Sequence, residues 1–205
     1  MTPRILHVPR GEALAIVAHP DDETIWMGGT ILSAPQTRWT ILSLCRKDDA
    51  DRASKFRRVC RRMYHARPLM SGLEDEGVMN IRESIPEIER RLRRELAGVR
   101  VAALFTHGYN GEYGHPRHKG VHRGVLNLLR RNVFSADSIF CFAYEPNENK
   151  VTPVRNAPFV SLLSQNTYKK KRMIIRDIYE FEDRSFEMRS AGKKEAFIQF
   201  APKKI

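Results

Sequence analysis

The stretch Ala18-His19-Pro20-Asp21-Asp22-Glu23 carries more information about the fold than any other part of the chain. It follows an apolar run at residues 13–17, which is typical of a buried strand, and a helix is predicted from residue 24 onward. In an open α/β sheet, ligands bind in the crevice beyond the carboxyl ends of the strands. One imidazole and three carboxylates are therefore expected at the ligand-binding edge of such a sheet.

Acidic residues at a helix start have a simpler explanation, because they cap free N–H groups and complement the helix dipole. That explanation covers Asp21, Asp22 and Glu23, but it leaves His19 at the end of a buried strand, before a stiffening proline, unexplained. A tight turn can aim His19 and Asp22 at one point, with Asp21 facing the same cavity as a free carboxylate. This arrangement predicts a hydrolytic metal site.

A second strand, polar turn and helix follow at residues 101–131, and the turn contains the run "HGYNGEYGHPRH" at 107–118. Two of its histidines, His115 and His118, are three residues apart and can share one face of a helical turn. We interpret His107 and His122 as loop and surface histidines, and His118 as a metal ligand. Two histidines and one aspartate leave a fourth zinc position open for water, as catalytic zinc sites require.

Together, "AHPDDE" and "GEYGHPRH" resemble the motifs of the PIG-L/LmbE-like zinc de-N-acetylases. Those enzymes remove acetyl groups from N-acetylglucosamine-type sugars. The similarity continues in "SLCRKDDADRASKFRRVCRRM" and "GLEDEGVMN", and it covers about residues 13–130. The resemblance implies a Zn²⁺ cofactor held by His19, Asp22 and His118. It also implies that Asp21 is the general base that takes a proton from zinc-bound water.

Three further roles follow from the same resemblance. His115 matches a histidine that stabilises the oxyanion or protonates the leaving amine, and Tyr113 matches a tyrosine that helps to polarise the acetyl carbonyl. Arg52 matches an arginine near the substrate, although the glutamate often found three residues later is Lys55 here. The family usually has aspartate at the position of Arg117. We expect Arg117 either to face His115 or to turn outward, toward solvent or a substrate phosphate.

The alternation of strands and helices predicts an α/β fold: a single Rossmann-like domain with a mainly parallel sheet covered by helices on both faces. The domain is expected to span residues 1–205, with a motif-bearing core at about 13–145 and a C-terminal extension at 146–205. Strands are predicted near 13–19, 39–44, 67–70, 101–106 and 138–144, and helices near 23–33, 52–65, 84–97 and 118–131. In the extension we expect a strand at 159–163, a basic helix at 165–180, and Phe197 and Phe200 packed on the body.

The composition indicates a soluble globular protein. Of 205 residues, 41% are hydrophobic and 29% charged, and the three cysteines form no CxxC pair, so neither a disulfide framework nor a thiolate zinc site is indicated. The N-terminal residues lack the apolar core of a signal peptide, and no run is long enough to span a membrane. We therefore expect a cytoplasmic protein without a transmembrane segment, and leave homo-oligomerisation open.

The formal net charge of +12 is high for a metabolic enzyme. We interpret the arginine and lysine clusters as solvated helix faces, whose field would suit an anionic glycoconjugate substrate. The predicted function is a zinc-dependent hydrolase that removes an acetyl group from an N-acetylglucosamine-type conjugate through Asp-activated, zinc-bound water. One alternative is a zinc amidase acting on another acyl group or conjugate. The other, less favoured, is a basic nucleic-acid-binding module whose metal site is not catalytic.

Overall fold

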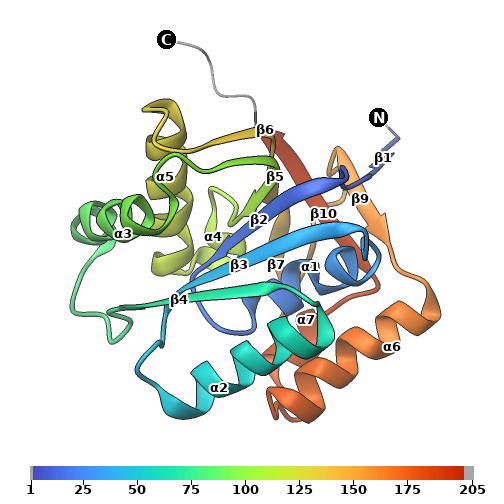
Figure 1. Cartoon of the computed structure of the whole chain (residues 1–205). Coiled ribbons are helices and arrows are strands. Elements are labelled where there is room, and N and C mark those ends of the chain that lie inside the picture. The colour runs from blue at the N-terminus through green and yellow to red at the C-terminus, as the bar shows by residue number, and fades with distance from the viewer. Residues whose placement is uncertain (1, 201–205) are drawn as a thin grey trace.

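A computed structural model describes residues 2–200, and within this range the chain forms one large sheet and one hairpin (Figure 1). The strands are β1 (Arg4–Ile5), β2 (Gly11–Val17), β3 (Thr37–Cys45), β4 (Arg67–Leu73), β5 (Arg100–Thr106), β6 (Ser135–Phe142), β7 (Tyr144–Asn147), β8 (Lys150–Pro153), β9 (Phe159–Leu162) and β10 (Lys194–Phe200). The helices are α1 (Asp22–Leu32), α2 (Ala50–Arg58), α3 (Ile81–Leu96), α4 (Gly111–Gly114), α5 (Pro116–Arg130), α6 (Gln165–Met173) and α7 (Phe186–Ser190), and two π-helical turns, η1 (Val59–Met63) and η2 (Ile174–Ile178), extend α2 and α6.

The large sheet has eight strands among the described residues, in the order β1-β9-β10-β6-β5-β2-β3-β4. Its central strands β6, β5, β2, β3 and β4 are parallel to one another, whereas β10 is antiparallel to both β6 and β9. The predicted α/β class with a mainly parallel sheet is confirmed. Because β2 and β5 are parallel neighbours, the motifs that follow them emerge at the same edge.

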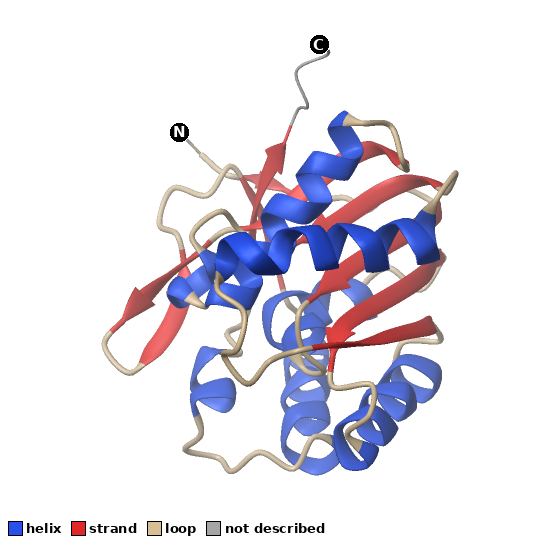
Figure 2. Ribbon diagram, turned by 90° about the vertical axis from the view of Figure 1, so that its left-hand side faces the viewer, coloured by secondary structure: helices blue, strands red, loops and turns tan. Residues whose placement is uncertain are grey.

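Helices cover both faces of the sheet, as predicted (Figure 2). On one face α3 and α5 pack through residues such as Ile88, Leu92 and Val125. The other face carries α1 together with α2, η1 and η2, and its core includes Trp26 and Phe56. The central strands are accordingly apolar on both sides, as expected for parallel strands buried between two helical layers.

The C-terminal segment differs from expectation. Beyond packing aromatic side chains, it forms β10, which inserts between β6 and β9, with Phe197 opposite both Phe142 and Phe159. The charged residues at the start of β10 obscured this strand in the sequence. One of them, Glu195, is fully buried.

Glu195 fixes the position of α1. Its carboxylate accepts hydrogen bonds from the backbone N–H groups of Gly29 (2.8 Å) and Thr30 (2.7 Å), and from the buried ammonium of Lys171 (2.7 Å). Tyr144 donates its hydroxyl to the carbonyl of Trp26 on the same helix at 2.6 Å. The C-terminal third of the chain therefore holds the helix that begins with the first motif. None of the helices in residues 2–200 combines the length and apolarity needed to cross a bilayer.

Candidate metal and active site

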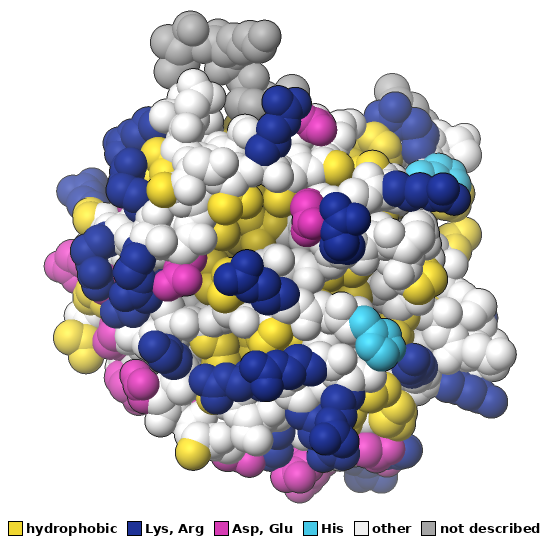
Figure 3. Space-filling view, viewed as in Figure 1, with side chains coloured by type: hydrophobic (Ala, Val, Ile, Leu, Met, Phe, Trp, Pro, Cys, Tyr) yellow, Lys and Arg dark blue, Asp and Glu magenta, His cyan; other side chains and the backbone are white. Residues whose placement is uncertain are grey.

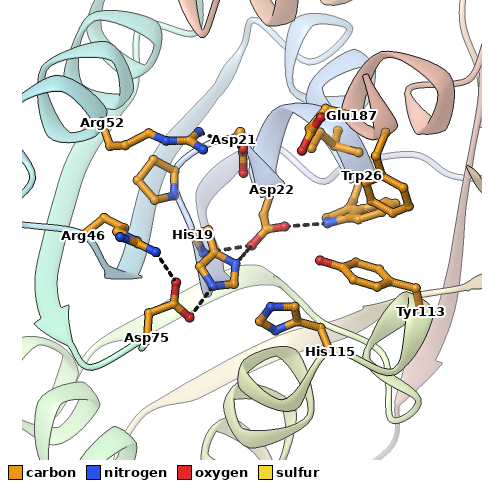
Figure 4. Close-up of a pocket in the computed structure, with 13 residues that line it drawn as sticks. His19, Asp21, Asp22, Trp26, Arg46, Arg52, Asp75, Tyr113, His115 and Glu187 are labelled. Carbon is orange, nitrogen blue, oxygen red and sulfur yellow. Dashed lines mark hydrogen bonds and ion pairs between the residues drawn. The ribbon is translucent and has the colours of Figure 1, made fainter. Parts of the chain in front are cut away.

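A polar cavity of about 180 Å³ lies at the carboxyl edge of β2 and β5, where the two motifs meet (Figure 4). Its walls include His19, Asp21 and Asp22 from the first motif and Tyr113 and His115 from the second. The two segments are about a hundred residues apart in sequence, and the parallel pairing of β2 with β5 brings them together. The expected sheet edge is therefore the one that carries the site.

Three side-chain atoms converge at one point beside this cavity. Nδ1 of His19 lies 3.2 Å from Oδ2 of Asp22, and Nε2 of His118 lies 3.3 Å from the first atom and 3.4 Å from the second. A tetrahedral zinc ion with ligand bonds of about 2.0–2.1 Å separates its ligand atoms by about 3.3 Å. The three residues therefore fit a zinc ion in both donor type and spacing.

In each histidine of this triad, the ring nitrogen that points away from the convergence point forms a hydrogen bond with a carboxylate. Nδ1 of His118 donates to Oε2 of Glu112 at 2.5 Å, and Nε2 of His19 donates to Oδ1 of Asp75 at 3.0 Å. These contacts place the N–H on the far side of each ring and leave a lone pair directed at the convergence point. Metal-ligating histidines commonly have such a partner, which fixes the tautomer and raises ligand basicity.

The aspartate of the triad is also oriented by a hydrogen bond. Oδ1 of Asp22 accepts the indole N–H of Trp26 at 2.8 Å, so Oδ2 is the oxygen that faces the histidines. Burial alone would raise the pKa of Asp22, but His118 and His107 outweigh burial and keep it well below the usual range. Asp22 is therefore an anion at neutral pH, as a metal ligand must be.

Asp21 is buried next to the triad and has strained backbone geometry. Its φ angle is 114°, a value that residues other than glycine rarely adopt, and its N–H donates to Glu23 at 3.1 Å. Burial and the neighbouring Asp22 raise the pKa of Asp21 above its ordinary range, while Arg52, which donates to Asp21 at 3.1 Å, opposes the shift. Such strain is characteristic of functional sites.

His115 and Tyr113 face the same cavity (Figure 4). The ring nitrogens of His115, His19 and His118 come within 4.8 Å of one another. Nδ1 of His115 accepts the backbone N–H of Arg117 at 3.2 Å, so the ring carries its proton on Nε2. Burial and the neighbouring His118 and His19 lower the pKa of His115 to about 4, so the ring is neutral at pH 7.

Arg117 and Lys55, the two residues that depart from the family pattern, each pair with acidic side chains. Arg117 is buried rather than turned to solvent, and its Nη2 donates to Glu74. Glu74 also accepts the backbone N–H groups of Val78 and Met79, so Arg117 helps to anchor the loop between β4 and α3. Lys55 pairs with Asp51 and Glu180 outside the cavity.

The interpretation of His107 as a loop or surface histidine is wrong. The residue is fully buried, and its Nδ1 donates to Glu112 at 2.8 Å while its Nε2 accepts the N–H of Ala18 at 2.9 Å. Glu112 therefore supports two histidines at once, including the predicted ligand His118. By contrast, His122 is half-buried on α5 and donates to the carbonyl of His107 at 2.8 Å, outside the triad.

Sequence reasoning missed several residues around the centre. Glu112 and Asp75 support the histidines, Arg46 donates to Asp75 at 3.0 Å, and α7 contributes Phe186 and Glu187 to the cavity wall. A signal for Glu112 was present: it is an acidic residue in a glycine-rich turn, six residues before His118. The residues of α7 follow no recognisable motif, and only the packing of the C-terminal third brings them to the site.

On the face seen in Figure 3, the basic residues do not gather in one patch. Lys and Arg side chains are spread over the whole face seen in Figure 3, between patches of other residues. At the cavity itself the two guanidinium groups, Arg46 and Arg52, each pair with a carboxylate, Asp75 and Asp21 respectively. This distribution agrees with the interpretation of most of the basic clusters as solvated faces.

Comparison with known proteins gives one family. Residues 14–129 match the family model described as PIG-L, GlcNAc-PI de-N-acetylase. A curated relative, the uncharacterized protein L374 of Acanthamoeba polyphaga mimivirus, is 20% identical over 190 residues, which cover 84% of this chain and 77% of that protein.

Two solved structures share the fold. The conserved protein TT1542 from Thermus thermophilus has a TM-score of 0.65 at 18% identity, covering 93% of this chain and 94% of its own. The N,N'-diacetylchitobiose deacetylase from Pyrococcus horikoshii has a TM-score of 0.62 at 16% identity, covering 92% of this chain and 83% of its own. At these identities the likeness concerns the fold.

The geometry of the triad makes a prediction about metal content. We expect the chain to bind one zinc ion, and His118→Ala to lose most of it, because a three-ligand site cannot spare one of its donors. Elemental analysis of protein dialysed against trace zinc measures the occupancy. His122→Ala on the same helix is the matched control and should keep the metal. Full occupancy in His118→Ala would show that the third ligand is another residue.

The carboxylate behind His118 makes a second prediction. Glu112→Gln keeps the size of the side chain but removes the charge, and we expect the zinc affinity to fall about 10- to 100-fold, as for other residues that support metal ligands. Competition with a chelating dye measures the dissociation constant. Glu187→Gln, which alters the cavity wall on α7 rather than the support of a histidine, serves as the control. An unchanged dissociation constant in Glu112→Gln would mean that Glu112 does not tune the ligand.

Proposed function

The chain belongs to the PIG-L family of GlcNAc-PI de-N-acetylases, and on this premise we propose that it is a zinc-dependent hydrolase that removes the acetyl group from an N-acetylglucosamine-type conjugate. One observation carries the proposal. The facing atoms of His19, Asp22 and His118 converge at 3.2–3.4 Å, and the buried carboxylate of Asp21 lines the same cavity. A purely structural metal site has no need of such an additional carboxylate beside an incomplete ligand set.

Amide hydrolysis needs an activated water, a polarised carbonyl and a proton for the leaving nitrogen. Zinc held by the triad would act as a Lewis acid: it would lower the pKa of water and polarise the carbonyl group. Asp21 then accepts the proton that the attacking water loses. Its raised pKa, opposed by Arg52, suits a group that takes up a proton and later releases it.

His115 supplies a hydrogen-bond donor on the other side of the reacting carbon. Because its Nδ1 accepts from the backbone, its Nε2–H is available to an oxygen that gains negative charge. A neutral donor of this kind stabilises the oxyanion, and Tyr113, whose pKa is raised by burial and by Asp22, also remains protonated. These assignments use the tautomer that the structure favours for His115.

The walls of the cavity suit a sugar. Aromatic rings from Trp26, Tyr113 and Phe186 form part of the wall, and the ring centroids of Tyr113 and Phe186 are 4.9 Å apart. The wall also contains the charged side chains of Arg46 and Glu187. Sugars present apolar C–H faces and hydroxyl edges, which aromatic rings and charged side chains respectively complement. This chemistry supports a small glycoconjugate as the substrate.

A direct test measures free amine and acetate released from a panel of N-acetylglucosamine conjugates by zinc-loaded protein. We expect release from at least one conjugate, loss of release after chelation, and recovery when zinc is restored. The panel should include neutral and phosphate-bearing conjugates, because the net charge of +12 favours anionic substrates. If zinc-loaded protein releases no acetate from any member, the proposal fails.

The role of Asp21 gives a third prediction. Asp21→Asn should keep its zinc but lose about two to four orders of magnitude in turnover, because an amide cannot accept the proton from water. Asparagine tolerates a positive φ, so the turn should survive the substitution. Asp51→Asn, an exposed carboxylate on α2, is the control for general loss of charge. Near-normal turnover in Asp21→Asn with zinc retained would remove Asp21 from the mechanism.

The lowered pKa of His115 gives a fourth prediction. A histidine with a pKa of about 4 is neutral throughout pH 5–8, so it contributes no limb to the rate profile in that range. His115→Gln should lower kcat by roughly 100-fold, as expected for loss of a well-placed oxyanion donor. The pH at the midpoint of the acid limb of kcat/KM should stay the same. Disappearance of that limb in His115→Gln would instead identify His115 as the titrating acid.

A further inference from the structure

A second cavity opens on the other side of His115. It has a volume of about 380 Å³, and it shares two wall residues, His115 and Asp75, with the cavity that contains the candidate active site. The remaining wall residues come from the loop after β4 and the first turns of α3 and α5: Gly77, Met79, Asn80, Ile81, Pro116 and Arg117. The two cavities thus meet at residues that flank the triad.

Apart from His115, the polar side chains of this second cavity are either paired within the protein or shielded from a ligand. Asp75 accepts from His19 and Arg46, and Asn80 forms a capping box at the start of α3. Nη2 of Arg117 pairs with Glu74, whereas Nε and Nη1 have no hydrogen-bond partner among the described residues. Both of these nitrogens are fully buried, so a ligand in the cavity does not reach them. What the cavity offers to a ligand is therefore the apolar surface of Met79, Ile81 and Pro116.

The geometry of an amide assigns this surface to one part of the substrate. A trans amide directs its two substituents away from each other. If the sugar occupies the polar cavity and the scissile amide lies at the triad, the acyl chain extends to the opposite side of the reacting carbon. The second cavity is the apolar space nearest to the triad, because it shares His115 and Asp75 with the polar cavity.

We propose that the cavity lined by Met79, Ile81 and Pro116 binds the acyl chain of the substrate, and that the enzyme prefers N-acyl amino sugars whose chain is longer than acetyl. The inference rests on the proposed function and names its substrate class. The reaction is hydrolysis: the oxygen of water bonds to the carbonyl carbon and the C–N bond breaks. The amino sugar leaves with a proton from water, and the acyl group leaves as a carboxylic acid.

The test compares N-acetyl-, N-butyryl- and N-hexanoyl-glucosamine, all of which release the same amine. Burial of one methylene stabilises a bound chain enough to change kcat/KM by roughly fourfold. We expect kcat/KM to rise by about this factor for each of the first few methylenes. A parallel series of alkyl glycosides of N-acetylglucosamine carries the same chains on the other side of the sugar.

Two variants fill the cavity. Met79→Trp and Ile81→Trp should remove most of the preference for the hexanoyl over the acetyl substrate, measured as the ratio of the two kcat/KM values. Val78→Trp is the matched control, because Val78 lies in the same loop, is 78% exposed and does not line the cavity. If one filling variant does not fold, the other and the chain-length series still decide the outcome.

Three results would contradict the inference. Equal or falling kcat/KM along the acyl series would show that the cavity binds no acyl chain. A preference for longer alkyl glycosides that Met79→Trp abolishes would assign the cavity to the aglycone instead. A preference that survives both filling variants would place the chain elsewhere. Failure of the proposed function looks different, since zinc-loaded protein would then release glucosamine from none of the acyl substrates.

Discussion

A hydrogen bond to one ring nitrogen of a histidine fixes which nitrogen carries the proton and how the ring is oriented, and interactions of this kind organise the centre of the molecule. Glu112 holds His118, Asp75 holds His19, and the indole of Trp26 holds the far oxygen of Asp22. Each supporting group comes from a different segment: the turn after β5, the loop after β4, and α1. Burial makes these pairings obligatory, because an unpaired ionised group in the interior costs several kcal/mol.

Backbone strain at the same place is a second consequence. Asp21 and Glu112 both have positive φ angles, 114° and 58°, and such conformations cost on the order of 1–3 kcal/mol each. The surroundings must offset this cost. Glu195, which is paired with Lys171, accepts a hydrogen bond from the backbone of α1. Glu112 accepts three hydrogen bonds, from His107, His118 and the N–H of Gly108. The C-terminal third is therefore needed for the geometry of a motif near the N-terminus.

The sequence by itself determined the fold class, the local elements and the family, and it supplied the hypothesis for the site. The apolar runs predicted the five central strands, and the two histidine-proline turns predicted a metal site at their carboxyl ends. The candidate ligands His19, Asp22 and His118, together with Asp21, were named from spacing and resemblance. The strand predictions succeed because they depend on residues close in sequence, where strand and helix periodicity is expressed directly. The ligand assignments remain predictions.

The tertiary structure alone decided what lies around those residues. The pairing of Asp75 with His19 and of Arg117 with Glu74 joins groups whose sequence spacing does not imply contact. Glu112 is close in sequence to His107 and His118, but only the folded turn shows that it accepts from both. The insertion of β10 between β6 and β9 joins strands that are distant in sequence, and the contact of Glu195 with Gly29 of α1 joins residues 166 positions apart. A buried charge has no periodic signature in a sequence. It becomes stable only through the partners that the folded chain brings to it, so its position follows from the fold as a whole.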